Sequence, residues 1–127
     1  MIKQTHTIFS IIFFISINLF GRVLPSDVVW NENETGYYTI KDNSIVLVST
    51  REKEDKIILS SSKINNIKIE SFSFSPSKKK VLLFTESVKV WRYNTKGDYW
   101  VYDFNKNEMQ KLGREMSSSS LMFAKFS

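Results

Sequence analysis

The apolar residues that follow residue 25 come in short runs, separated by clusters of turn-forming residues. The runs are rich in β-branched and aromatic residues, and they do not repeat at helical spacing. Short runs of this composition between turn signals are typical of β-strands. We therefore expect an all-β fold, with strands at 37–40, 44–50, 56–60, 69–75, 80–86, 88–94, 98–104 and 121–127.

The N-terminal segment has a different pattern. Lys3 is followed by an apolar run from Ile8 to Phe20, which is too short to cross a bilayer as a helix. A positive start followed by an apolar run of this length is typical of a secretory signal peptide. We expect residues 1–25 to form a signal helix, acting as a signal peptide or a signal anchor. The protein is then exported, and it is periplasmic, extracellular or membrane-anchored.

The composition removes several kinds of chemistry. Cysteine is absent, and the one histidine, His6, lies in the expected signal. The segment after the signal therefore has no disulfide, no thiol nucleophile, no Cys or His metal site and no Ser-His-Asp triad. The four glycines are too far apart to form a phosphate-binding loop. We expect no catalytic residues, no metal site and no cofactor in these 127 residues.

The charge does not indicate a nucleic-acid partner. The formal net charge is +5, but Lys3 and Arg22 lie in the expected signal, which leaves 16 basic against 13 acidic residues. The basic residues are scattered among acidic ones, and the one basic run, 78–80, lies at an expected turn. Such runs are usually solvated faces.

The strand pattern repeats along the chain. An apolar strand, a polar turn and a second apolar strand occur around Val29-Trp30 and again around Phe74-Ser75, and a third copy begins near Phe126-Ser127, at spacings of 45 and 52 residues. Repeats of this size with about four short strands suggest propeller blades. We expect residues 26–127 to form about two blades and the start of a third. The propeller is then incomplete, because the chain stops inside a blade at Ser127.

A resemblance to a known family supports this interpretation. FSPxxxxVLL at 74–83, VKxWR at 88–92 and YxxYD at 99–103 occur in this order. The chain from 28 to 127 resembles the N-terminal propeller region of the dipeptidyl peptidase IV family of prolyl oligopeptidase-like serine peptidases. In that family a β-propeller caps an α/β-hydrolase domain, which carries the catalytic Ser, Asp and His and removes Xaa-Pro or Xaa-Ala dipeptides from peptide N-termini.

The resemblance implies the following partners and activity. The partners are the remaining propeller blades and the hydrolase domain of a full-length parent, which is a homodimer. A peptide substrate binds only in that parent. The catalytic triad and the two acidic residues that bind the free amine of the substrate have no counterpart among these 127 residues. The chain by itself is therefore expected to be inert.

Arg92 is the one site residue that the resemblance carries over. It corresponds to the arginine of VKxWR, which hydrogen-bonds a carbonyl oxygen of the bound peptide. A guanidinium group suits this role, because it offers several donors in a rigid fork and stays charged. Strand alternation places Arg92 on one face with Val88 and Val90, so it would end an apolar face. The simpler interpretation is a solvated arginine at a strand end.

Other features have structural and functional interpretations. Six aromatic residues between 91 and 104 form either sheet core or a platform for a peptide or carbohydrate. Asp98 follows Gly97 in an expected turn, and Asp103 closes a strand, so neither is expected to act in catalysis. The serine runs 60–62 and 117–120 are interpreted as polar loops. An alternative function therefore remains, a small exported binding protein that uses aromatic strand faces.

Overall fold

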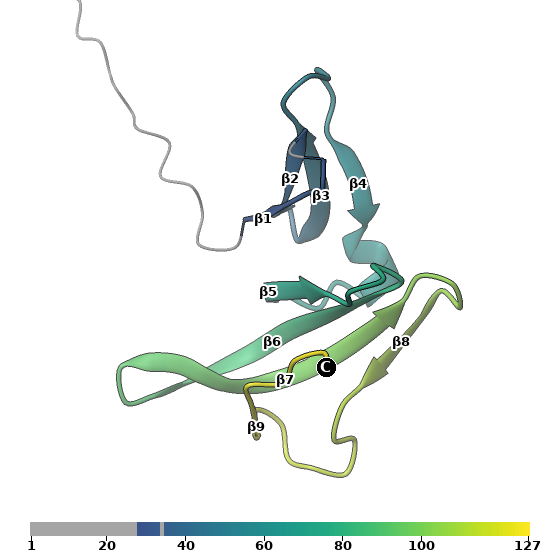
Figure 1. Ribbon diagram of the computed structural model, residues 1–127. Coiled ribbons are helices and arrows are strands. Elements are labelled where there is room, and N and C mark those ends of the chain that lie inside the picture. Colours follow the sequence, from purple (N-terminus) through teal and green to yellow (C-terminus); the bar gives the residue numbers. More distant parts are fainter. Residues whose placement is uncertain (1–27, 34) are drawn as a thin grey trace, which may run out of the picture.

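The computed structural model describes residues 28–33 and 35–127, which form two antiparallel β-sheets (Figure 1). The expected signal helix at 1–25 lies outside the described residues. The first sheet has the strand order β1-β2-β3-β4, and the second has β5-β6-β7-β8, with β9 paired to β7. The strands are β1 Val29–Trp30, β2 Gly36–Lys41, β3 Ser44–Ser49, β4 Lys56–Leu59, β5 Ile69–Phe74, β6 Lys80–Val90, β7 Tyr93–Asp103, β8 Glu108–Lys111 and β9 Leu121–Met122.

The prediction of an all-β fold is confirmed for this part of the chain. Its only helix is a short 3-10 helix, η1 Ser61–Ile64, which connects the two sheets. Within the described ranges, no helix has the length and apolar character needed to cross a membrane. The first two copies of the predicted repeat each open one sheet, because Trp30 ends β1 and Phe74 ends β5.

Local turn chemistry accounts for several of the connections. Asp42 and Asn43 form the two-residue turn between β2 and β3, with φ of 48° and 58°. Asp and Asn tolerate this left-handed conformation, and two such residues in succession form the turn that matches the twist of a hairpin. The predicted turn after β5 is also present, where the Lys80 N–H donates to Ser75 Oγ at 3.1 Å.

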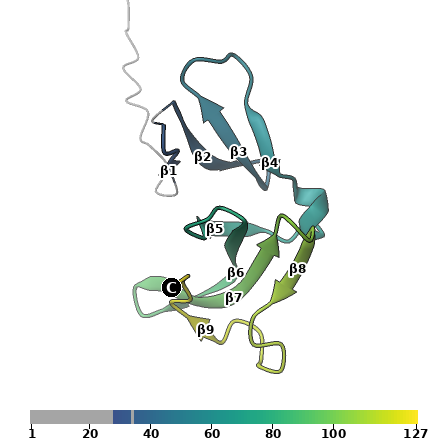
Figure 2. The same ribbon diagram turned by 45° about the vertical axis from the view of Figure 1, so that its right-hand side comes forward.

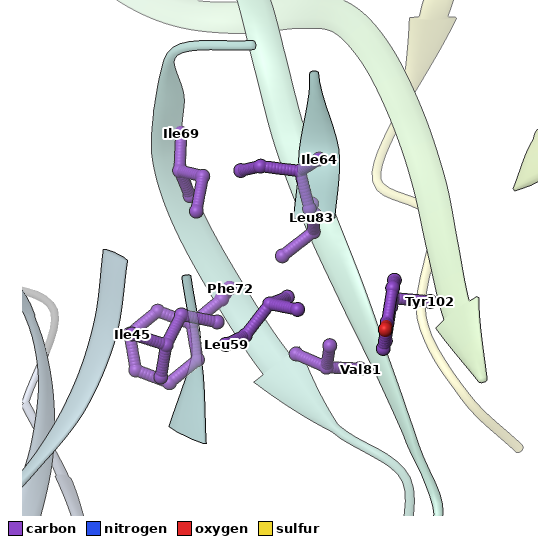
Figure 3. Close-up of a cluster of buried hydrophobic side chains, with 8 residues drawn as sticks. All are labelled: Ile45, Leu59, Ile64, Ile69, Phe72, Val81, Leu83 and Tyr102. Atoms are coloured by element: carbon purple, nitrogen blue, oxygen red, sulfur yellow. The ribbon is translucent and has the colours of Figure 1, made fainter. Parts of the chain in front are cut away.

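The two sheets share one hydrophobic core, which Figure 3 shows in close-up. The first sheet contributes Ile45 and Leu59. The second sheet contributes Ile69, Phe72, Val81, Leu83 and Tyr102, and Ile64 lies in η1 at the connection. Burying an aliphatic side chain of this size contributes about 1.5–3 kcal/mol. Both views show one sheet stacked above the other (Figure 2).

A polar contact also joins the sheets. The Asn43 side chain donates to the Ile67 carbonyl at 2.8 Å and accepts from the Ile69 N–H at 2.8 Å. These two bonds satisfy one backbone group just before β5 and one at its first residue. The left-handed turn of the first sheet therefore fixes the start of the second.

Some predicted strand boundaries are wrong. The structure has one strand, β6, across 80–90, and the turn comes at 91–92, whereas we expected separate strands at 80–86 and 88–94. Consequently Gly97 and Asp98 lie inside β7 and not in a turn. Asp103 does close that strand, as expected. The predicted strand at 121–127 is reduced to β9, and β8 was not predicted.

Candidate functional site

The β6–β7 hairpin extends well beyond the second sheet. On one side β5 pairs only with the residues of β6 from 81 to 85, and on the other side β8 pairs only with the residues of β7 from 100 to 103. The hairpin beyond these pairings projects from the sheet, as Figure 1 shows at its left side. Only β9 pairs near its base, where Met122 lies opposite Lys96. The sequence element VKxWR forms the tip of this projection.

The tip is a tight and strained turn. Val90 pairs with Tyr93, so Trp91 and Arg92 are the two residues of the loop. Trp91 has φ of 62°. A bulky residue rarely adopts this conformation, which costs about 1–3 kcal/mol and occurs preferentially at functional sites. Trp91 is 94% exposed, so burial of its ring does not offset this cost.

Arg92 is exposed at this turn. No carboxylate among the described residues forms an ion pair with it. Its guanidinium donors are therefore available to an acceptor such as a carbonyl oxygen. The prediction that Arg92 ends an apolar strand face is wrong in its geometry, because the strand has already ended at Val90 and Val88 is 47% exposed.

A β-bulge lies at the base of the projecting hairpin. The pairing of β6 with β7 shifts between Thr85 and Val88, so that Glu86 and Ser87 together lie opposite Gly97. Glu86 has φ of 50°, a left-handed conformation that occurs at one kind of bulge. A bulge bends the strand and increases its twist. The direction in which the hairpin leaves the sheet is therefore set at this point. A second register shift, between Val88 and Lys89, leaves Thr95 without a partner closer to the tip.

Asp98 lies beside the bulge and is only 4% exposed. Its carboxylate accepts bonds from Lys111 Nζ at 2.6 Å, Ser118 Oγ at 3.0 Å and the Ser119 N–H at 2.8 Å. Burial acts to raise the pKa of Asp98, but these bonds outweigh it and hold the pKa below its ordinary value. Asp98 therefore binds the 117–120 loop to β7 and has no free face for catalysis.

The aromatic residues near the hairpin divide into two groups. Tyr99 and Tyr102 are buried, and Trp100 and Phe104 pack against the core cluster. These four make sheet core, which was the structural interpretation of the aromatic cluster. Trp91 and Tyr93 alone are strongly exposed, at the hairpin tip.

A pocket of about 310 Å³ lies on the second sheet near the hairpin base. Its wall includes the rings of Phe72, Phe84, Tyr99 and Phe123 together with serine and threonine side chains. A wall of this kind can accommodate an apolar group and offers no charge. No group of three or more His, Cys, Asp or Glu that could hold a metal ion occurs among residues 28–33 and 35–127.

One feature of the sequence indicates the bulge. An isolated glycine within a strand pattern indicates a bulge or a close backbone approach. Gly97 is such a residue, followed directly by the aromatic run of β7. No comparable signal marked the turn at Trp91 and Arg92, because neither residue type favours turns.

Comparison with known proteins supports the resemblance. The family model of the dipeptidyl peptidase IV N-terminal region matches residues 75–127. Dipeptidyl aminopeptidase B of Saccharomyces cerevisiae is 32% identical in an alignment 98 residues long that covers 72% of this chain and 12% of the yeast protein. Prolyl endopeptidase FAP is 28% identical over 79 residues in Mus musculus and 26% identical over 87 residues in Homo sapiens.

The match covers a small part of these relatives. The chain spans 12% of the yeast protein and 10% and 11% of the mouse and human proteins. Each alignment covers more than half of this chain, namely 72%, 62% and 68%. The family model includes the whole hairpin with Arg92 and most of the second sheet.

Proposed function

From the similarity of this chain to the N-terminal region of the dipeptidyl peptidase IV family, we propose that it forms opening blades of the β-propeller of an exported prolyl dipeptidyl peptidase. Residues 26–127 supply about two blades and the start of a third. In this proposal Arg92 is a substrate-binding residue of the parent enzyme, which removes Xaa-Pro dipeptides. The catalytic groups belong to a hydrolase domain, and the parent is a homodimer.

The sheet architecture supports the propeller. Each sheet begins with four consecutive antiparallel strands in sequence order, and the two sheets stack on a common core. Propeller blades have this four-stranded form, and each blade buries its faces against its neighbours. The alternation of sheet, short connection and sheet along the chain agrees with such an arrangement.

The hairpin tip carries the proposal for the site. Arg92 is exposed on a strained turn at the tip of the β6–β7 hairpin. Neither β5 nor β8 pairs with the part of the hairpin that carries this turn. An exposed guanidinium in a fixed place can donate to a peptide carbonyl oxygen without first breaking an ion pair. The strained backbone of Trp91 is not offset by burial of its side chain, which is consistent with a functional role for this turn.

The polypeptide of 127 residues is expected to be inactive by itself. It contains one histidine, His6, and no cysteine. A serine or cysteine nucleophile needs an adjacent base to react at neutral pH. The purified chain should release no nitroaniline from Gly-Pro-p-nitroanilide. Turnover that persists through a second, independent purification would contradict this expectation.

The role of Arg92 can be tested in a chimera. Residues 28–127 of this chain replace the matching segment of the yeast dipeptidyl aminopeptidase B, and hydrolysis of Gly-Pro-p-nitroanilide is measured. A hydrogen bond from a charged group contributes about 1.5–3 kcal/mol, so Arg92→Ala should lower kcat/KM by about 10- to 100-fold. Arg92→Lys should restore only part of this loss, because an ammonium group cannot reproduce the fork of donors.

Lys89→Ala is the matched control, because Lys89 is an exposed cation on the same hairpin. It should leave kcat/KM within about twofold, in the range of surface substitutions. An Arg92→Ala chimera that is produced in normal amount and is as active as the Lys89→Ala chimera would remove Arg92 from the substrate site.

The alternative of a binding protein with aromatic strand faces is less well supported. It requires several accessible rings on the sheet, whereas Tyr99 and Tyr102 are buried and only Trp91 and Tyr93 of the 91–104 cluster are strongly exposed. The exposed pair flanks Arg92 in the same turn. Its position fits a role beside the arginine better than a separate platform.

A further inference from the structure

A carboxylate on β5 contacts the bulge below the Arg92 hairpin. The pairing of β5 with β6 shifts between Ile69 and Ser71, so Glu70 is an extra residue without a partner on β6. Its side chain instead reaches Ser87, the second residue of the bulge. Glu70 Oε1 accepts from the Ser87 N–H at 3.0 Å, and Glu70 Oε2 accepts from Ser87 Oγ at 2.5 Å.

These two bonds replace the strand pairing that ends at this level. The last pair of β5 with β6 on this side is Ile69 with Thr85, and beyond it the hairpin has no neighbouring strand from β5. Bonds to a charged acceptor are about twice as strong as bonds between neutral groups. The Glu70 carboxylate therefore adds a side-chain contact between β5 and β6 beyond the last backbone pair, at the bulge itself.

The opposite side of the bulge is held as well. Ser119 Oγ donates to the Glu86 carbonyl at 2.7 Å, and the Ser119 N–H donates to Asp98 at 2.8 Å. Gly97 lies opposite the bulge with no room for a side chain, because an added Cβ would be 2.6 Å from the Thr85 carbonyl oxygen. The bulge is thus fixed between Glu70 on one side and the 117–120 loop on the other.

The distance from the bulge to the tip makes this fixation important. From Ser87 the strand continues for three residues to Val90, about 10 Å, before the turn that carries Arg92. A rotation of about 10° at the bulge moves the tip by about 2 Å, and a misplacement of about 1 Å can cost about 100-fold in rate. A small loosening at Ser87 is therefore amplified at Arg92.

We propose that Glu70 is a positioning residue for Arg92: its carboxylate fixes the Glu86–Ser87 bulge and so sets the direction of the projecting hairpin. Glu70 itself touches no substrate. The proposal rests on the role of Arg92 given above, but the hold on the bulge can be measured independently of that role.

The first measurement is hydrogen–deuterium exchange of the full chain. Glu70→Ala removes the acceptor of the Ser87 N–H, so amides from 86 to 96 should exchange at least about tenfold faster, while those from 81 to 85 keep their protection. Glu70→Gln should restore most of the protection, because its amide can still accept from the Ser87 N–H and donate to Ser87 Oγ. Glu54→Ala, at an exposed glutamate between β3 and β4, is the matched control.

The second measurement is a double-mutant cycle in the chimera. Glu70→Ala should lower kcat/KM for Gly-Pro-p-nitroanilide by about tenfold or more, and Glu70→Gln by much less. In the Arg92→Ala background, Glu70→Ala should cause no further loss, because a residue that acts through Arg92 has nothing left to position. A general loss of stability would instead add to the effect of Arg92→Ala.

The outcomes separate the two proposals. If the amides of residues 86–96 exchange at equal rates in Glu70→Ala and Glu54→Ala, Glu70 does not fix the bulge. Faster exchange across the whole second sheet, or independent losses in the cycle, also overturns it, since Glu70 then serves stability alone. If Arg92→Ala has no effect on kcat/KM while the exchange results are as expected, the role of Arg92 fails and the hold on the bulge stands.

Discussion

Gly97→Ala is expected to lower the free energy of unfolding by about 3 kcal/mol, which is the upper part of the usual range for forcing extra atoms into a packed site. An added Cβ would lie 2.6 Å from the Thr85 carbonyl oxygen and 2.3 Å from the Phe84 ring. The ring can move, but the carbonyl belongs to β6 at the edge of the bulge. Either β7 separates from β6 there or the bulge is lost, and urea unfolding followed by circular dichroism measures the cost.

Gly113→Ala is the matched control for this substitution. Gly113 has φ of 60°, and a Cβ there would meet the flexible side chain of Met116 at 3.0 Å. Alanine at this position costs about 1 kcal/mol because of the left-handed backbone conformation, but its Cβ does not collide with backbone atoms. Gly97 has no such φ, so its cost is steric. If both variants unfold at the same urea concentration, the close approach of β6 and β7 at Gly97 is wrong.

Asp98→Ala is expected to cost about 2–3 kcal/mol, because it leaves donors of the 117–120 loop and Lys111 without their acceptor. The Asp98 side chain is 6% exposed and that of Lys111 is 23% exposed, so water replaces the lost bonds only in part. Asp55→Ala removes a carboxylate from an ion pair with Lys41 whose side chains are 37% and 48% exposed. This control should cost less than about 1 kcal/mol. The same unfolding measurement compares them, and equal costs would show that the Asp98 cluster is not buried in solution.

The pH dependence of this cluster has a definite sign. Because the pKa of Asp98 is held below its ordinary value, its contribution to stability is complete above the unfolded value of about 3.9. The contribution is lost as the pH falls from there toward the lower folded value. Asp103 also has a lowered pKa, because the backbone N–H groups of Lys106 and Asn105 donate hydrogen bonds to it. It therefore contributes in the same direction to the loss of stability at acid pH. The difference between the wild-type chain and Asp98→Asn isolates the part due to Asp98, and it should shrink below about pH 4.

The sequence predicted the class of fold better than the strand boundaries. Runs such as 44–50 and 56–60 became β3 and β4 nearly unchanged, because β-branched residues between turn signals specify a strand locally. Asp42 and Asn43 formed the turn that their residue types favour. The VKxWR element identified Arg92 through resemblance, and the structure places this residue at an exposed tip.

The geometry around Arg92 was decided by the tertiary structure. Trp91 and Arg92 make a turn although neither favours one, because the pairing of β6 with β7 places Val90 opposite Tyr93. Register and bulges depend on which strands lie alongside and how their backbones fit, and no local propensity carries this information. For the same reason Glu70 and Ser87, 17 positions apart, became partners only when β5 and β6 paired. Local residue types were enough to specify an all-β chain and the Asp42–Asn43 turn, whereas the pairing of β6 with β7 placed Arg92 in a turn at the tip of the hairpin.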